Sequence, residues 1–148
     1  MLFICKYNVG RSQMAEAFFN RLSKKDHAVS AGVDPYYIKH YGARIPQKDP
    51  VIKCMSEEGF DFSDNMVKMA SRDTVKKADI IVALMDKKRA ARDLPMYIKR
   101  SPSFRLWEVH DVNGRQNFES GYKKYLANRE RIKGKVKALV KELEHNGT

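Results

Sequence analysis

The chain has 148 residues, 43% of them apolar, which fits one ordinary domain, residues 1–148, with a hydrophobic core and excludes a disordered chain. The longest apolar run, residues 80–85, is too short to cross a membrane, and the first residues lack a secretion signal, so we expect a cytoplasmic protein with no membrane partner. Its two cysteines, Cys5 and Cys54, cannot build a disulfide framework and have no second Cys or His at zinc-ligand spacing. We therefore expect neither a metal nor a cofactor.

The net charge is +11, from 29 Lys and Arg residues against 18 Asp and Glu residues. A field of this sign attracts anions such as phosphorylated substrates, oxyanions or nucleic acid. A solvated basic surface gives the same total, so charge alone does not choose among these partners.

The first third of the chain alternates short apolar segments with a helical pattern. Residues 2–4 predict a buried strand, the apolar spacing over residues 12–22 predicts a helix, and residues 28–31 predict a second strand. Residues 32–48 form a long predicted loop, a feature that is often functional, and it contains Tyr36, Tyr37 and Tyr41.

The same alternation continues to the end. We expect a helix over residues 50–58, a helix or turn within 63–77, a strand at 80–85 and a fourth strand at 106–109. The clearest pattern is an amphipathic helix over residues 118–143. Strands that alternate with helices predict an α/β fold of the flavodoxin-like, three-layer type, with a four-stranded parallel sheet and helices on both faces.

The segment from Cys5 to Ser12 stands between the first strand and the first helix. Ligands of parallel sheets bind at the carboxyl ends of strands, and a helix N-terminus favours an anion and a thiolate. Arg11 supplies a planar fork for a tetrahedral oxyanion, and Ser12 is suited to cap the helix or to bond the thiolate. The predicted phosphate-binding residues are Lys6, Tyr7, Asn8, Val9, Gly10, Arg11 and Ser12.

This segment, continued by residues 13–17, resembles the phosphate-binding loop and first helix of the low-molecular-weight protein tyrosine phosphatase superfamily, which includes thioredoxin-coupled arsenate reductases. Weaker similarities follow in the same order along the chain, at residues 30–32, 58–63, 78–82 and 107–114.

The resemblance implies specific roles for site residues. Cys5 matches the nucleophile that forms a phosphocysteine, and Arg11 matches the arginine that binds the equatorial oxygens. Ser12 matches the serine that stabilises the thiolate, Asn8 the asparagine that holds the loop, and Asp111 the general acid. The predicted catalytic residues are therefore Cys5, Arg11 and Asp111.

Three positions depart from the family pattern. Val112 follows the aspartate where proline is usual, Tyr7 stands where family phosphatases commonly have glycine, and Gly10 replaces a second loop cysteine found in many of them. An ordinary turn before Asn113 and Gly114 is the alternative interpretation of Asp111.

Several functions remain open from the sequence. The first is hydrolysis of a phosphomonoester, with phosphotyrosine the favoured substrate. The second is arsenate reduction, for which Cys5 needs a second thiol in the chain or an external one. The only other thiol of the sequence, Cys54, lies on a predicted helix and is better explained as a buried hydrophobe. A third possibility is a non-enzymatic basic module that binds acidic partners, but it leaves Cys5 and Arg11 unexplained. A cysteine phosphocarrier accounts for Cys5 but not for Arg11. Nucleic acid is a disfavoured partner.

Overall fold

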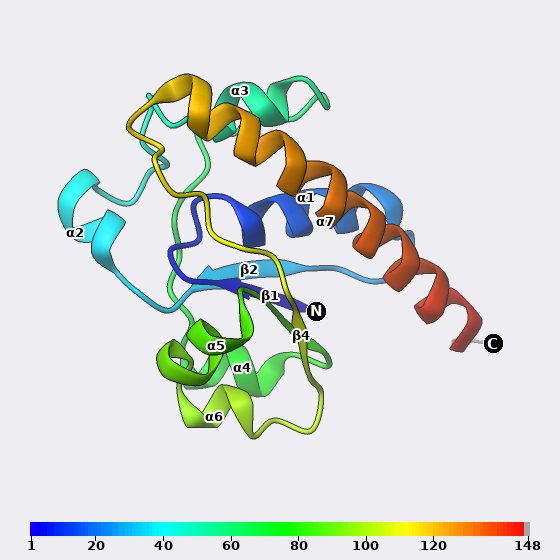
Figure 1. Cartoon of the computed structure of the whole chain (residues 1–148). Helices are drawn as coiled ribbons and strands as arrows, with labels where there is room; N and C mark the ends of the chain where they lie inside the picture. The colour runs from blue at the N-terminus through cyan, green and yellow to red at the C-terminus, as the bar shows by residue number, and fades with distance from the viewer. Residues whose placement is uncertain (147–148) are drawn as a thin grey trace.

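Four short parallel strands form the centre of the fold, and the structure, a computed structural model, describes residues 1–146 of the chain. The strands pair in the order β2-β1-β3-β4, and every pairing is parallel, which confirms the predicted sheet (Figure 1). Their bounds are Leu2–Cys5 for β1, Val29–Gly32 for β2, Ile81–Leu84 for β3 and Phe104–Trp107 for β4.

The sheet is covered by helices on both faces, because successive side chains of a strand point to opposite sides. Phe3 of β1 packs into one apolar cluster, while its neighbours Leu2 and Ile4 pack into a second one. The first face carries α1 (Arg11–Leu22), α3 (Val51–Ser56) and α7 (Phe118–Asn146), and the second carries α4 (Arg72–Lys77), α5 (Lys87–Asp93) and α6 (Met96–Lys99) (Figure 1).

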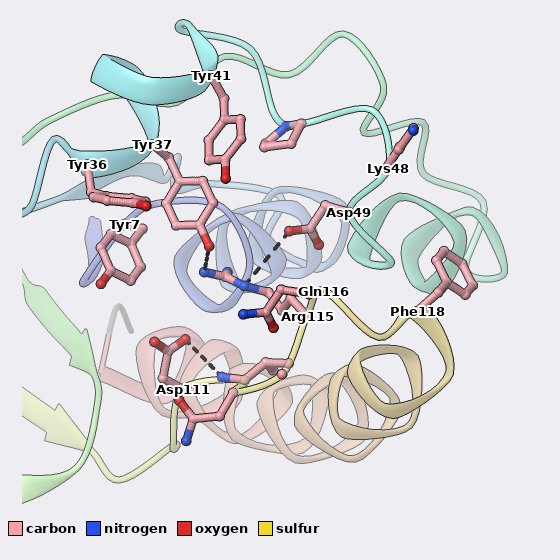
Figure 2. Close-up of a pocket in the computed structure, with 14 residues that line it drawn as sticks. Tyr7, Tyr36, Tyr37, Tyr41, Lys48, Asp49, Asp111, Arg115, Gln116 and Phe118 are labelled. Atoms are coloured by element: carbon pink, nitrogen blue, oxygen red, sulfur yellow. Dashed lines mark hydrogen bonds and ion pairs between the residues drawn. The ribbon is translucent and has the colours of Figure 1, made fainter.

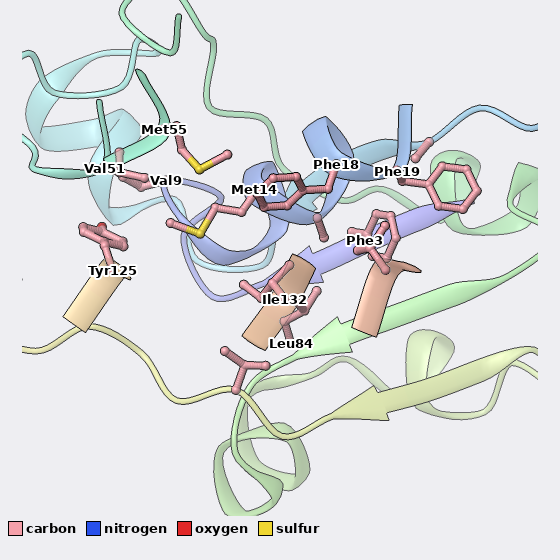
Figure 3. Packing of buried hydrophobic residues seen from close by; sticks show 14 of the residues in the cluster. Phe3, Val9, Met14, Phe18, Phe19, Val51, Met55, Leu84, Tyr125 and Ile132 are labelled. Atoms are coloured by element: carbon pink, nitrogen blue, oxygen red, sulfur yellow. The ribbon is translucent and has the colours of Figure 1, made fainter. Parts of the chain in front are cut away.

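The long helix α7 lies against α1 over the first face of the sheet. Its apolar stripe is buried, with Ile132 and Val136 fully covered, as the amphipathic pattern predicted. Figure 3 shows Met14 and Phe18 of α1 beside Ile132 and Leu84, so α1 is packed between the sheet and the outer helices. No helix within residues 1–146 is both long and apolar enough to span a bilayer.

The structure corrects several predicted boundaries. Strand β4 ends at Trp107, two residues before the predicted end, because Val109 has left the sheet and its carbonyl accepts a hydrogen bond from Arg11. The predicted loop 32–48 contains a short helix, α2 (Tyr36–Tyr41), beyond the carboxyl end of β2 (Figure 1). Helices α5 and α6 were not predicted, since each is too short to show a helical repeat of apolar residues.

Candidate active site

The predicted phosphate-binding loop turns sharply between β1 and α1. Cys5 is the last residue of β1 and Arg11 the first of α1, so both stand at the carboxyl edge of the sheet. Asn8, between them, has a backbone φ of 62°, the left-handed conformation that asparagine tolerates better than most residues. The turn brings the cysteine and the arginine to one narrow pocket.

Buried hydrogen bonds from the Asn8 side chain hold the loop in this shape. Its amide nitrogen donates to the hydroxyl of Ser12 at 2.8 Å and to the hydroxyl of Ser30 at 3.0 Å. Its amide oxygen accepts from the backbone N–H of Lys68 at 2.9 Å. Gln13 adds a bond to the Asn8 carbonyl at 3.0 Å. The loop is therefore tied to β2, to α1 and to the segment before α4.

The thiol of Cys5 is held by donors on its own loop. Its sulfur lies 2.9 Å from the hydroxyl of Ser12 and accepts from the backbone N–H of Asn8 at 3.3 Å. The residue is only 2% exposed. These contacts, together with the N-terminus of α1, stabilise negative charge on sulfur. Ser12 serves the thiol rather than the helix end, because Gly10 is the cap residue of α1 and no side-chain cap bond forms there.

Arg11 is fixed by carbonyl groups from two distant segments. One terminal nitrogen donates to the carbonyl of Leu84 at 2.8 Å and to that of Val109 at 3.0 Å. The other lies 3.3 Å from the carboxylate of Asp111. A guanidinium held in this way presents its fork in a defined plane, which suits two oxygens of a tetrahedral anion.

Asp111 lies at the same pocket, as the sequence predicted, in the segment between β4 and α7. One carboxylate oxygen faces Arg11 and accepts from the N–H of Val112 at 2.8 Å, and the other lies 3.9 Å from Arg89. The side chain is 12% exposed. Asp111 thus lines the same narrow pocket as Cys5, where a carboxyl group is a candidate for proton transfer.

The predicted phosphate-binding residues divide into two groups. The narrow pocket is lined by the loop residues Cys5, Tyr7, Val9, Gly10 and Arg11. The other three loop residues do not line it. The side chain of Lys6 lies over the ring of Tyr7 and 3.9 Å from Asp93, while Asn8 and Ser12 support the loop from behind.

Position 10 has no room for a side chain, because a residue far away in the sequence packs against it. A Cβ atom added at this position would lie 2.6 Å from the ring of Tyr125 on α7. The absence of a side chain at Gly10 therefore allows an aromatic ring to approach the loop, and this ring closes one side of the narrow pocket.

A wide cleft of about 750 Å³ adjoins the narrow pocket. Figure 2 shows Tyr36, Tyr37 and Tyr41, all of α2, along its upper wall. Tyr7 and Asp111 line it as well. The cleft leads from solvent to the candidate nucleophile and has an aromatic lining.

Sequence reasoning missed a buried polar group at the junction of the two cavities. Arg115 donates to the hydroxyl groups of Tyr37 and Tyr125, and its Nε lies 4.0 Å from the carboxylate of Asp49. Figure 2 shows Arg115 between Tyr37 and Asp49. Burial raises the pKa of Asp49. Burial disfavours the charge on Arg115, but Tyr125, Asp49 and Tyr37 outweigh this and raise its pKa. No local motif points to these residues, since they come from four separate segments.

Cys54 lines neither the narrow pocket nor the wide cleft. It lies on α3 in the main apolar cluster with no exposed surface, as predicted. Burial raises the pKa of its thiol to about 11, although Arg129 lies beside it. Within the described residues, 1–146, no group of three or more His, Cys, Asp or Glu side chains is arranged to hold a metal ion.

Among curated proteins, similarity runs to arsenate reductases. The putative arsenate reductase of Halobacterium salinarum is 31% identical over 88 residues, which cover 55% of this chain and 56% of that protein. The match thus spans about half the length of this relative.

Solved structures share the fold over nearly the whole chain. A low molecular weight protein tyrosine phosphatase from T. tengcongensis is 28% identical with a TM-score of 0.71, covering 96% of this chain and 97% of that one. The arginine phosphatase of Geobacillus stearothermophilus is 18% identical with a TM-score of 0.75, covering 98% and 92%, a likeness of fold alone. The model of the low molecular weight phosphotyrosine protein phosphatase family matches residues 1–148, and the chain therefore belongs to that family.

Proposed function

We propose that this protein hydrolyses phosphomonoesters, with an aryl ester such as phosphotyrosine as its substrate. One observation carries the proposal: Cys5, Arg11 and Asp111 line a single narrow pocket. A nucleophile, an anion-binding fork and a carboxylate at one cavity are the parts that covalent phosphoryl transfer requires.

The proposed reaction has two steps. The thiolate of Cys5 attacks phosphorus, an S–P bond forms and the P–O bond to the leaving group breaks, while Asp111 gives a proton to the departing oxygen. Water then attacks the phosphocysteine, Asp111 accepts a proton from that water, and the S–P bond breaks to release inorganic phosphate. Arg11 binds the equatorial oxygens through both steps, where the charge of the transition state develops.

The wide cleft supports an aryl leaving group. Tyr7, Tyr36 and Tyr37 form a group of ring contacts on its wall, with the centroids of Tyr7 and Tyr37 4.9 Å apart. Such rings bind another planar ring by edge or offset stacking. The narrow pocket then takes the phosphoryl group while the cleft takes the ring attached to it.

Arsenate reduction is the second candidate, because the curated relative from Halobacterium salinarum is named a putative arsenate reductase. In that reaction a second thiol attacks the sulfur of a Cys5–arsenic adduct, the S–As bond breaks and leaves its electron pair on arsenic, which becomes As(III), and a disulfide forms between the two sulfurs. Cys54 is the one other cysteine in the sequence, and it is buried with its pKa raised to about 11. An external dithiol would have to supply the electrons.

Parallel assays separate the two candidates. The wild type is given phenyl phosphate in one assay, and arsenate with dithiothreitol in the other, with Cys5→Ser as the inactive control in both. Release of phosphate without thiol consumption supports the hydrolase. If arsenate is reduced at a rate far above that of ester hydrolysis, the protein is a reductase, and Cys54→Ala then shows whether the second cysteine takes part.

A further inference from the structure

Four of the described residues line both the narrow pocket and the wide cleft. They are Tyr7, Asp111, Val112 and Arg115. The atoms that link a phosphoryl group in the narrow pocket to the rest of a substrate in the cleft must pass between these side chains. The charge and shape of these four side chains therefore act on the leaving group of the reaction.

Arg115 fills a site built for a guanidinium group. Its planar head lies 4.6 Å from the ring centroid of Tyr37 and 5.7 Å from that of Tyr7. The carboxylate of Asp49, visible beside Arg115 in Figure 2, and the hydroxyl of Tyr125 complete the set of partners. Aromatic faces, a carboxylate and hydroxyl acceptors are the groups that recognise a guanidinium. Here the protein's own arginine satisfies them.

The partners hold this cation firmly at the junction of the cavities. The Arg115 side chain is 12% exposed and that of Asp49 only 4%. The hydroxyl of Tyr125, on α7, is fully buried and hydrogen-bonded to Arg115. A side chain anchored to α7, to the segment before α3 and to α2 at once does not swing away at low cost when a substrate enters.

We propose that Arg115 is a specificity-determining residue, whose fixed guanidinium excludes substrates with a cationic leaving group, such as phosphoarginine, and reserves the junction for uncharged aryl esters. This inference rests on the proposed phosphatase function. In the excluded reaction the thiolate of Cys5 would attack phosphorus, the P–N bond would break, and Asp111 would give a proton to the departing nitrogen. Arg115 weakens the binding of the guanidinium group of that substrate and does not alter the chemical steps.

Two physical effects produce the exclusion. A second guanidinium at the junction would meet a like charge at close range in a partly buried site, where repulsion is poorly screened. The same substrate would also find Asp49 and the ring of Tyr37 already occupied by Arg115, and the remaining carboxylate, Asp111, already paired with Arg11. It would therefore lose water and gain few partners. A neutral ring suffers neither penalty and gains contact with the tyrosines. Specificity of this kind comes from an element that repels the wrong ligand.

The test compares kcat/KM for phosphotyrosine and phosphoarginine in four proteins. The wild type should prefer phosphotyrosine by on the order of 10²–10³-fold, the discrimination that a like-charge contact produces. Arg115→Lys keeps the charge and should keep most of the preference. Arg115→Met frees Asp49 for a substrate guanidinium and should reduce the preference by roughly 100-fold or reverse it. The control Arg105→Met removes an equal charge from β4, outside both cavities, and should leave the ratio unchanged.

A binding measurement keeps the test independent of turnover. Inhibition constants for phenylphosphonate and for a guanidinoalkyl phosphonate should show the same selectivity and the same reversal in Arg115→Met. If that variant fails to fold because Asp49 is left buried and unpaired, the double variant Asp49→Asn/Arg115→Met removes both charges. It should lose the repulsion without gaining an acceptor, and give an intermediate ratio.

The outcomes separate this inference from the proposed function. A wild type that cleaves neither ester contradicts the phosphatase proposal, and the phosphonate constants still decide the role of Arg115. If the wild type cleaves phosphotyrosine and Arg115→Met leaves the ratio of the two kcat/KM values unchanged, the specificity role of Arg115 is contradicted and the phosphatase proposal stands. A wild type that prefers phosphoarginine, or the guanidinoalkyl phosphonate, overturns the inference outright.

Discussion

The carboxylate of Asp111 and the guanidinium of Arg11 form an ion pair of 3.3 Å at the mouth of the narrow pocket. Both are also fixed from behind, Arg11 by the carbonyls of Leu84 and Val109, and Asp111 by the N–H of Val112. The proposed acid and the proposed anion-binding group are therefore positioned by one another. An oxyanion that binds Arg11 brings its own ester oxygen to the carboxyl group of Asp111.

The first prediction follows from this pair. Asp111→Asn should slow hydrolysis of phenyl phosphate by on the order of 10²–10⁴-fold, the range of positioned proton transfer. Hydrolysis of p-nitrophenyl phosphate should suffer much less, because its leaving group needs little protonation. The basic limb of the pH–rate profile, which depends on a protonated acid, should flatten.

The control for this variant is Asp86→Asn, since Asp86 is the next carboxylate that follows a strand. Asp86 caps α5 by accepting from the N–H of Arg89 at 2.9 Å, and it lines neither the narrow pocket nor the wide cleft, so it is not placed to give a proton to the leaving group. Its variant should lose some stability and keep the leaving-group pattern of the wild type. If Asp111→Asn folds normally and treats both esters as the wild type does, Asp111 is not the acid.

The second prediction concerns the nucleophile. Cys5→Ser should lower kcat by at least about 10³-fold, because a serine hydroxyl at this site has no base within the loop to activate it. Phosphate should still bind, since Arg11 and the loop backbone are unchanged. Isothermal titration with phosphate checks the binding, and a full rate in the serine variant would contradict covalent catalysis by Cys5.

The third prediction uses the contrast between the two cysteines. Iodoacetamide near neutral pH should modify Cys5, and phosphate or vanadate should protect it, since the anion sits over the sulfur. Cys54 should resist modification with or without the anion, because it lines neither cavity, whereas Cys5 lines the narrow pocket, and because its pKa is raised to about 11. Mass spectrometry of peptides reads both sites. Equal protection of the two thiols would show that the anion acts elsewhere.

The fourth prediction is a pH dependence of stability that arises from Cys54. Burial raises its pKa from 9.0 to about 11, so between these values the unfolded chain loses the proton that the folded chain keeps. The unfolded state then binds fewer protons, and the free energy of unfolding falls as pH rises through this window. The loss is on the order of 2 kcal/mol. Urea titrations from pH 8 to 11 should show the wild type losing more stability than Cys54→Ala, and parallel curves would contradict the assignment.

The fifth prediction separates two roles of Asn8, its side-chain hydrogen bonds and its left-handed backbone conformation. Asn8→Ala leaves the buried hydroxyl of Ser30 and the N–H of Lys68 without this partner and forces a φ of 62° on alanine, so it should cost about 2 kcal/mol or more and most of the activity. Asn8→Gly relieves the strain but not the lost bonds, so it should be intermediate in stability. Thermal melts with kcat/KM for the same samples check this order. Equal loss in both variants would show that backbone strain contributes little.

Much of the candidate site could be read from the sequence, because it is local. The loop from Cys5 to Ser12 is one continuous segment in which the strand, turn and helix signals adjoin. The proposed nucleophile Cys5, the proposed anion-binding Arg11 and the supporting Asn8 could therefore be predicted from the sequence. The parallel sheet was likewise readable from strands that alternate with helices. Short helices such as α2 and α5 were not, since one or two turns carry no repeat of apolar residues.

Only the tertiary structure decided what surrounds the loop. Arg115, Asp49 and Tyr125 meet because α7 packs across the loop and α3, and no pattern within any of those segments records the contact. The sequence therefore determined which residues form the predicted phosphate-binding loop, because these are neighbours along the chain. The tertiary structure determined what meets that loop, namely Asp111 beside Arg11. It also determined the leaving-group end, where Arg115 meets Asp49 and Tyr37, each more than 60 residues away from it in the sequence, because only packing brings them together.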